Sequence, residues 1–283
     1  MGNTRKIVKT GKSTPTREGA GVHLRRAFGF NEVPELDPFL LLDDFRSQEP
    51  AHYLAGFPWH PHRGIETITY MLAGSVEHGD SMGNKGTIGP GDVQWMTAGS
   101  GIIHQEMPKG DEQGRMGGFQ LWANLPSGSK MMDPRYREVK GSAIPTVAPS
   151  TGCTARIICG EINGIVGPVR DIVTDPEYLD ISLEAGASFT HRTKRGHTLF
   201  AYVIEGTVNA GETPVASEHL VIFDREGREA VFSAGKGKAR FLLISGKPLG
   251  EPVAWYGPIV MNTEEELELA FEEYRKGTFI KKS

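Results

Sequence analysis

Cysteine is scarce in this sequence, which has only Cys153 and Cys159 among its 283 residues. Two cysteines at this spacing do not form a zinc motif, and we expect both to be reduced thiols. Long apolar runs are also missing, and no segment approaches the length of a membrane-spanning helix. The basic N-terminal stretch lacks the apolar core of a secretory signal. These absences predict a cytoplasmic protein, found also in the nucleus if its source is eukaryotic, with no membrane partner.

A large excess of charge of one sign is absent as well. The formal net charge is −4, with 23% charged and 38% hydrophobic residues, which is typical of a folded protein with a real core. Without a basic excess, direct binding of nucleic acid has no electrostatic support. A small-molecule ligand or a protein partner remains compatible with this composition.

Glycine, in contrast, is abundant, with 36 residues spread along the chain. Gly-containing turns separate short apolar runs rich in β-branched and aromatic residues, which is the pattern of β-strands. The predicted strands occupy residues 66–72, 91–97, 117–125, 155–160, 199–206, 219–224 and 239–245. The sequence therefore predicts an all-β protein.

A weak internal repeat divides the chain. ITYMLAGSV (68–76) resembles FAYVIEGTV (200–208), and the polar, proline-bearing segment 126–152 lies between the two copies. We expect two β domains, one over residues 1–135 and one over residues 150–283. The matched residues include Tyr70 with Tyr202 and Gly74 with Gly206.

One helix is expected near the C-terminus, within the second domain. Thr263 and Glu266 form the pattern of a capping box, and Gly277 is placed to end the helix. Its apolar face would comprise Leu267, Ala270, Phe271 and Tyr274. We expect this helix to pack on a β domain.

The stretch FPWHPHRGIET places His60 and His62 on either side of Pro61. In a strand, both histidines point to one face with Cβ atoms roughly 6.6 Å apart, so their rings can converge on one metal ion. Pro61 lacks an N–H and suits an edge strand. Solvated or core histidines would also explain the pair. The repeat places Arg192 and Lys194 at these positions in the second domain, so only the first carries the pair.

A second pair strengthens the metal hypothesis. His104 and Glu106 also stand one residue apart, and the same parity puts them on one face of a strand. Three imidazoles and one carboxylate suit a first-row transition metal such as iron, and a six-coordinate ion would keep two positions open. A structural zinc site would instead be closed by four ligands.

The motifs around these residues resemble the pirin family of the cupin superfamily. They are HPH with the following RGIET, PGDVQWMTAGSGIIHQEMP (90–108), FQLWANLP (119–126), FLLLDDF (39–45) and EPVAWYGPIVMNT (251–263). The resemblance implies a bicupin, with two β-barrel, jelly-roll-like domains. It also implies one Fe(II) site in the first barrel, with ligands at His60, His62, His104 and Glu106. Nickel, cobalt, manganese, copper or zinc could occupy such a site as well.

A second glutamate competes for the role of carboxylate ligand. Glu66 follows His62 at the spacing of the ordinary cupin motif HxHxxxE. Pirin-like sequences instead supply the carboxylate directly after the last histidine, which favours Glu106. Glu66 is then expected to hold a histidine N–H or to pair with Arg63, whose alternative is a solvated charge.

The resemblance implies quercetin 2,3-dioxygenase activity, in which O2 opens the central ring of a flavonol and carbon monoxide is released. Glu106 would be both a metal ligand and the catalytic base. The alternative is a non-enzymatic, iron-dependent redox sensor or transcriptional co-regulator that acts through a protein partner. Phe57, Trp59 and Met107 would line an apolar pocket or belong to the core. His78 is expected to be solvated in a turn region.

Overall fold

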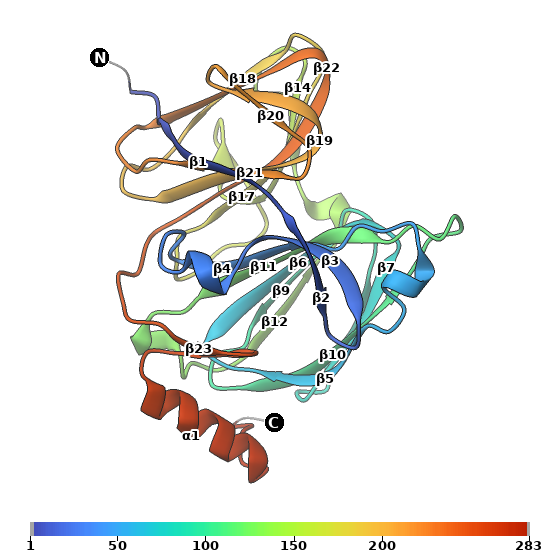
Figure 1. Ribbon diagram of the computed structural model, residues 1–283, viewed down its shortest axis with the longest axis vertical. Helices are drawn as coiled ribbons and strands as arrows, with labels where there is room; N and C mark the ends of the chain where they lie inside the picture. The colour runs from blue at the N-terminus through green and yellow to red at the C-terminus, as the bar shows by residue number, and fades with distance from the viewer. Residues whose placement is uncertain (1–2, 282–283) are drawn as a thin grey trace. The chain divides into compact units, whose positions relative to one another are not determined.

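The computed structural model describes residues 3–281, which are mostly β-strands (Figure 1). Their contacts separate into two units. We call the first the N-terminal barrel; it contains residues 14–35, 39–142 and the segment from Leu249 onward. The second, the C-terminal barrel, contains residues 143–248, the segment up to Ser13 and the short stretch 36–38. The fold is the expected bicupin with a C-terminal helix.

Two sheets and a hairpin build the N-terminal barrel. In the larger sheet the strand order is β12-β9-β6-β11-β4-β3-β2, and in the smaller it is β5-β10-β7-β8. These strands are β2 (Thr14–Glu18), β3 (Val22–Phe28), β4 (Phe39–Asp44), β5 (Phe57–His62), β6 (Ile65–Ala73), β7 (Ser75–Asp80), β8 (Lys85–Ile88), β9 (Val93–Thr97), β10 (Ile102–Lys109), β11 (Gly117–Asn124) and β12 (Arg135–Val139). The hairpin of β23 (Ala254–Tyr256) and β24 (Ile259–Met261) carries the chain to helix α1 (Glu264–Arg275). Short 3-10 turns lie at Phe30–Glu32, Pro50–His52 and Ser127–Ser129.

One large sheet dominates the C-terminal barrel, in the order β1-β21-β19-β22-β17-β14-β13, with β18 paired to β22 and β20 to β19. Its strands are β1 (Ile7–Lys12), β13 (Thr146–Val147), β14 (Cys153–Cys159), β17 (Glu177–Leu183), β18 (Ser188–Arg192), β19 (Thr198–Ala210), β20 (Thr213–Ala216), β21 (His219–Phe223) and β22 (Glu229–Gly246). A separate hairpin joins β15 (Glu161–Ile162) and β16 (Ile165–Val166), and a 3-10 turn covers Gly141–Ala143. Cys153 and Cys159 are buried and are not joined in a disulfide.

The ends of the chain are distributed differently from the expected domains 1–135 and 150–283. Strand β1 pairs with β21 of the C-terminal barrel, and α1 packs on β24 of the N-terminal barrel. Edge pairing and the burial of an apolar helix face bring these segments together, and no local signal in the sequence shows which barrel each segment joins. The segment 126–152 does connect the units, because β12 belongs to one and β13 to the other.

Local sequence signals place α1 where it was predicted. The Thr263 side chain accepts a hydrogen bond from the Glu266 N–H, and the Glu266 side chain returns to the Thr263 backbone, so the capping box is present. Leu267 and Ala270 are buried against Ile259 and neighbouring apolar residues of the N-terminal barrel. Within residues 3–281, no helix is long and apolar enough to cross a membrane.

Candidate metal centre

Strands β5 and β10 bring the predicted histidines together. They pair antiparallel, with His104 opposite His60 and Ile102 opposite His62. β5 is an edge strand that pairs only with β10 in its sheet. An edge strand tolerates Pro61, which has no N–H to donate to a neighbouring strand. Gly64 then turns the chain with φ +78°, and a Cβ there would lie 2.0 Å from the Val260 carbonyl oxygen. Only glycine fits this turn.

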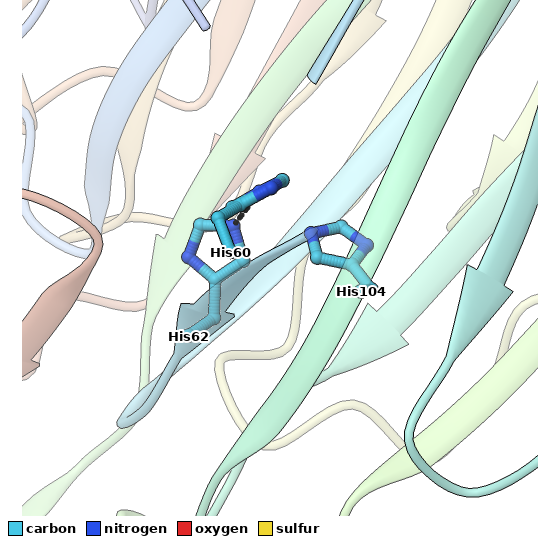
Figure 2. Close-up of side chains that lie close together, drawn as sticks. All are labelled: His60, His62 and His104. Carbon is cyan, nitrogen blue, oxygen red and sulfur yellow. Dashed lines mark hydrogen bonds between the residues drawn. The ribbon is translucent and has the colours of Figure 1, made fainter. Parts of the chain in front are cut away.

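The three imidazoles converge within the N-terminal barrel (Figure 2). One ring nitrogen from each of His60, His62 and His104 can be chosen so that all lie within 4.8 Å of one another. The Nε2 atoms of His60 and His62 are 3.1 Å apart. Among the described residues this is the one cluster of histidine, cysteine or carboxylate side chains with metal-binding spacing.

Backbone carbonyls fix the orientation of two rings. His60 Nδ1 donates to the Pro58 carbonyl oxygen at 2.8 Å, and His62 Nδ1 donates to that of Pro258 at 2.9 Å. Because a carbonyl only accepts, each Nδ1 carries a proton, and in the neutral, metal-binding form of each ring the lone pair is on Nε2. Such an arrangement is the one that orients histidines toward a metal ion.

The spacing fits a bound cation. Two nitrogens bound at about 2.0–2.1 Å lie about 2.9 Å apart at a right angle and about 3.3 Å apart at a tetrahedral angle, which brackets the observed 3.1 Å. Neither ring nitrogen of His104 has a hydrogen-bond partner among the described residues, although the side chain is buried. A transition metal that binds imidazole would give the His104 ring a partner and would bind His60 and His62 at the same time.

Burial keeps these rings in the neutral form that binds metals. Desolvation, aided by the neighbouring His60, lowers the pKa of His62 to about 3. Desolvation also lowers the pKa of His104 well below its ordinary value, with His62, His60 and His78 adding to the effect. Protons therefore compete weakly with a cation at these two side chains near neutral pH.

Glu106 lies in the same cavity but outside the three-histidine cluster. Its Oε1 is 3.1 Å from Thr69 Oγ1, which is also 2.6 Å from Gln120 Oε1. A hydroxyl carries one proton, so Thr69 donates to one of these two oxygens at a time. The prediction that Glu106 is a fourth ligand remains a prediction.

A cavity of about 770 Å³ opens beside the histidines. His60, His62 and Glu106 line it together with mainly apolar side chains, including Leu24, Phe45, Trp122 and Trp255. Of the residues expected to flank the ligands, Phe57 does line the cavity. Trp59 does not line it and is 53% exposed, so it does not belong to the core either. The size and lining are those of a site for a drug-sized organic molecule.

Glu66 and Arg63 do not interact as expected. Glu66 accepts a hydrogen bond from Thr97 at 2.6 Å, and desolvation raises its pKa. Arg63 is 2% exposed and binds Glu273 at 2.7 Å, so it is neither solvated nor paired with Glu66. The turn at Gly64 moves the chain from one sheet to the other, so strand parity from His62 does not extend to Glu66.

Other contacts around the site were missed or misjudged from the sequence. His78 is buried in β7 and stacks on Tyr136 at 4.8 Å, so the expectation of a solvated ring was wrong. Lys130 is also buried, and its ammonium donates to the carbonyls of Gly64 and Val260 and to the Asn124 side chain. It thereby ties the turn after His62 to the hairpin that carries the Pro258 carbonyl. No local pattern signals such long-range contacts.

Comparisons with known proteins agree with this architecture. The Pirin family model matches residues 21–123, and the model for the Pirin C-terminal cupin domain matches residues 178–280. The chain belongs to the pirin family. It is 44% identical to a pirin-like protein of Caulobacter vibrioides, over 97% of this chain and 99% of that protein. It is 40% identical to the pirin of Homo sapiens, over 97% and 94% of the two chains.

A solved structure of this kind is similar throughout. The crystal structure of quercetin 2,3-dioxygenase from Acinetobacter baumannii superimposes with a TM-score of 0.90, at 34% identity, covering 98% of each chain. The pirin architecture of two cupin domains thus extends over nearly the whole sequence.

Proposed function

We propose that this pirin is a metal-dependent dioxygenase that opens the central ring of flavonols such as quercetin, with Fe(II) as its metal. The observation that carries the proposal is the three-histidine cluster, of which His60 and His62 line a largely apolar cavity of about 770 Å³. A purely structural metal site has no use for such a space. The similarity to the Acinetobacter quercetin 2,3-dioxygenase supports the same reaction class.

His60, His62 and His104 would hold the ion, with Glu106 as a further ligand if its side chain turns toward them. When bound, the metal supplies a Lewis acid for the flavonol oxygen and access to dioxygen chemistry. The two rings held by the Pro58 and Pro258 carbonyls keep their lone pairs directed at one point without further rearrangement.

Glu106 is the base in this proposal. It removes the proton of the flavonol 3-hydroxyl, which makes the central ring electron-rich enough to react with O2. The protonated carboxyl can then donate to Thr69 Oγ1, 3.1 Å from Oε1, while the Thr69 proton points to Gln120 Oε1. The acquired proton is therefore held inside the cavity by a hydrogen-bonded chain.

The aromatic walls bind the flat ligand and exclude water. Trp122 packs edge-on against His62 with ring centroids 5.0 Å apart, and Trp255 lies 6.0 Å from Trp122. Both line the cavity, as does Phe57. Aromatic side chains at these positions favour planar ring systems through offset or edge contacts.

Oxygen uptake tests the proposal. Protein loaded with Fe(II) should consume O2 on addition of quercetin and release carbon monoxide, measured with an oxygen electrode and a haem-based carbon monoxide assay. Glu106→Gln should slow the reaction by about 100-fold or more, the usual effect of removing a general base. Glu66→Gln is the matched control, because Glu66 lies on β6 outside the cluster and should leave the rate unchanged.

Loaded protein that consumes no oxygen with quercetin or related flavonols would contradict the proposal. The same measurement separates it from the redox-sensor alternative, since a sensor binds the ion without turnover. Equal loss of rate in Glu106→Gln and Glu66→Gln would remove the assignment of Glu106 as the base.

A further inference from the structure

A row of polar side chains crosses the inner face of the larger sheet in the N-terminal barrel. In the strand register, Arg26 faces Asp43, Asp43 faces Gln120, and Gln120 faces Thr69. All four line the cavity. Cross-strand neighbours have Cβ atoms about 4.5–5.5 Å apart, so the row is continuous from β3 to β6.

Both ends of the row are hydrogen-bonded. Arg26 binds both carboxylate oxygens of Asp43, at 2.8 and 2.7 Å, and reaches Glu18 at 2.9 Å. At the other end, Thr69 Oγ1 makes its shorter contact with Gln120 Oε1, at 2.6 Å. These bonds set the Asp43 carboxylate and the Gln120 amide in fixed orientations beside the cavity.

The middle of the row is open. No hydrogen bond joins Asp43 to Gln120 among the described side chains, although the two are register partners. An ionised carboxylate has about four lone-pair positions, of which Arg26 uses two. Thr69 occupies the Gln120 carbonyl, which leaves the Gln120 N–H groups as donors toward the cavity. A donor and an acceptor therefore stand next to each other at a cavity wall.

We infer that Asp43 and Gln120 form a recognition site for a second phenolic hydroxyl of the ligand, on a part of the ligand other than the hydroxyl that Glu106 deprotonates. Such a hydroxyl donates a hydrogen bond to the Asp43 carboxylate and accepts one from the Gln120 amide, which satisfies both groups at once. The site lies one to two strand spacings, about 5–10 Å, from the strand that carries Thr69. That is the scale of an aromatic ring attached to the flavonol core.

This inference rests on the proposed flavonol chemistry and sharpens it: the ligand class is a planar polyphenol with hydroxyls at both ends. A ligand that lacks the second hydroxyl would leave buried polar groups unpaired, which is a strong basis for rejection. Asp43 is only 4% exposed, so water in the filled cavity does not readily replace the missing group.

Binding without turnover tests the site. Affinities of anaerobic Fe(II)-loaded protein are measured by titration calorimetry for quercetin, which has hydroxyls on both outer rings, and for 3-hydroxyflavone, which has none there. The wild type should prefer quercetin by about 10- to 100-fold, the range that a hydrogen bond to a charged group supports. Gln120→Met should lower this ratio several-fold by weakening quercetin binding alone, because it removes the amide donor and leaves the Asp43 carboxylate in place.

Gln105→Met is the matched control, because Gln105 lies between His104 and Glu106 on β10 and outside the cavity lining. It should retain the wild-type ratio. Gln120→Glu keeps the side-chain shape and removes the N–H donors, so it should lower the ratio as well and serves if the Met variant folds poorly.

Equal affinities for the two flavonols in the wild type, or an unchanged ratio in both Gln120 variants, would overturn the recognition site. Failure of the activity is a separate outcome. If the wild type prefers quercetin and Gln120→Met lowers that preference, but the wild type consumes no oxygen, the recognition site is retained and the dioxygenase reaction is discarded. If neither flavonol binds, both proposals are wrong.

Discussion

Strands β5 and β10 of the N-terminal barrel contribute His60, His62 and Glu106 to the wall of an open cavity. Strands β18 and β22 of the C-terminal barrel instead contribute Phe189 and Phe232 to a filled core. The pairs correspond in their connections. β5 pairs with β10, which pairs with β7; β18 pairs with β22, which pairs with the later part of β19. One scaffold thus supports two interiors.

The core of the C-terminal barrel shows the packing contacts that the cavity removes from the N-terminal barrel. In the C-terminal barrel, Phe232 lies 4.6 Å from Phe241 and 5.7 Å from Phe223 between ring centroids, and all three are buried in one cluster. Side chains around a cavity lack such partners on one side and lose that dispersion energy. The N-terminal barrel therefore gives up packing around its cavity, whereas the C-terminal barrel keeps a filled core.

Metal content should differ most sharply between the two barrels. His62→Ala removes one of the converging lone pairs, and we expect metal affinity to fall by more than about 100-fold, beyond the effect of altering residues that only orient a ligand. The measurement is metal analysis combined with chelator competition. Lys194→Ala, at the position aligned with His62 in the C-terminal barrel, should leave affinity unchanged. Full metal content in His62→Ala would contradict the site.

The stability of the protein should depend more on the filled core of the C-terminal barrel than on the cavity wall of the N-terminal barrel. Phe232→Ala opens a void in a closed core and should lower the free energy of unfolding by about 3–5 kcal/mol. Phe45→Ala trims a wall that already borders the cavity, so the loss should be smaller by about 1–2 kcal/mol. Urea unfolding of the metal-free variants measures both. Equal losses would mean that the cavity wall is packed as tightly as the filled core.

Much of this arrangement could be read from the sequence, because the signals are local. Period-two alternation and glycine turns located the main strands, Thr263 and Glu266 located the helix start, and the i, i+2 spacing put His60 and His62 on one face. Each of these depends on residues a few positions apart.

The errors share a different origin. The spacing of the cupin motif HxHxxxE suggested Glu66 as a neighbour of the histidines, but Gly64 carries the chain into another sheet. The partner of Arg63 is Glu273, 210 positions along the chain, and the Pro258 carbonyl that orients His62 is 196 positions away. Contacts at such separations are set by the tertiary fold, which no local period encodes.

The buried histidines of the N-terminal barrel should make the free energy of unfolding depend on pH. The folded-state pKa of His62 is about 3 and that of His104 is also lowered, whereas both rings titrate near 6.5 when unfolded. Between pH 6.5 and about 3 the unfolded chain binds protons that the folded chain does not, so stability falls as pH falls. Each ring contributes a slope of at most about 1.4 kcal/mol per pH unit.

His62→Gln should therefore flatten the pH dependence of unfolding in metal-free protein over this window, by up to one proton. Urea unfolding at a series of pH values gives the slope. A variant whose slope matches the wild type would show that His62 is not held neutral by burial.

The smallest difference between the barrels should come from a feature that both contain, a glycine at the same position of the repeat. Gly74 follows β6 with φ +68°, and Gly206 lies in β19 with φ +72°, the equivalent place in the repeat. An added Cβ would lie 2.6 Å from the Lys109 carbonyl oxygen at Gly74 and 2.1 Å from that of Lys238 at Gly206. Both positions thus combine a left-handed backbone with a close carbonyl, and glycine is required in each copy.

Gly206→Ala should lower stability by about 2–3 kcal/mol and Gly74→Ala by slightly less, since its carbonyl lies farther away. Gly211→Ala separates backbone strain from the clash: its φ is +57°, but no atom lies within 4 Å of the added Cβ, so about 1 kcal/mol is expected. Thermal unfolding of the three variants gives the order. If Gly74→Ala loses no more stability than Gly211→Ala, the clash with the Lys109 carbonyl must be relieved by a shift of the backbone. The N-terminal barrel, with its cavity, would then adjust at Lys109 more easily than the filled barrel adjusts at Lys238.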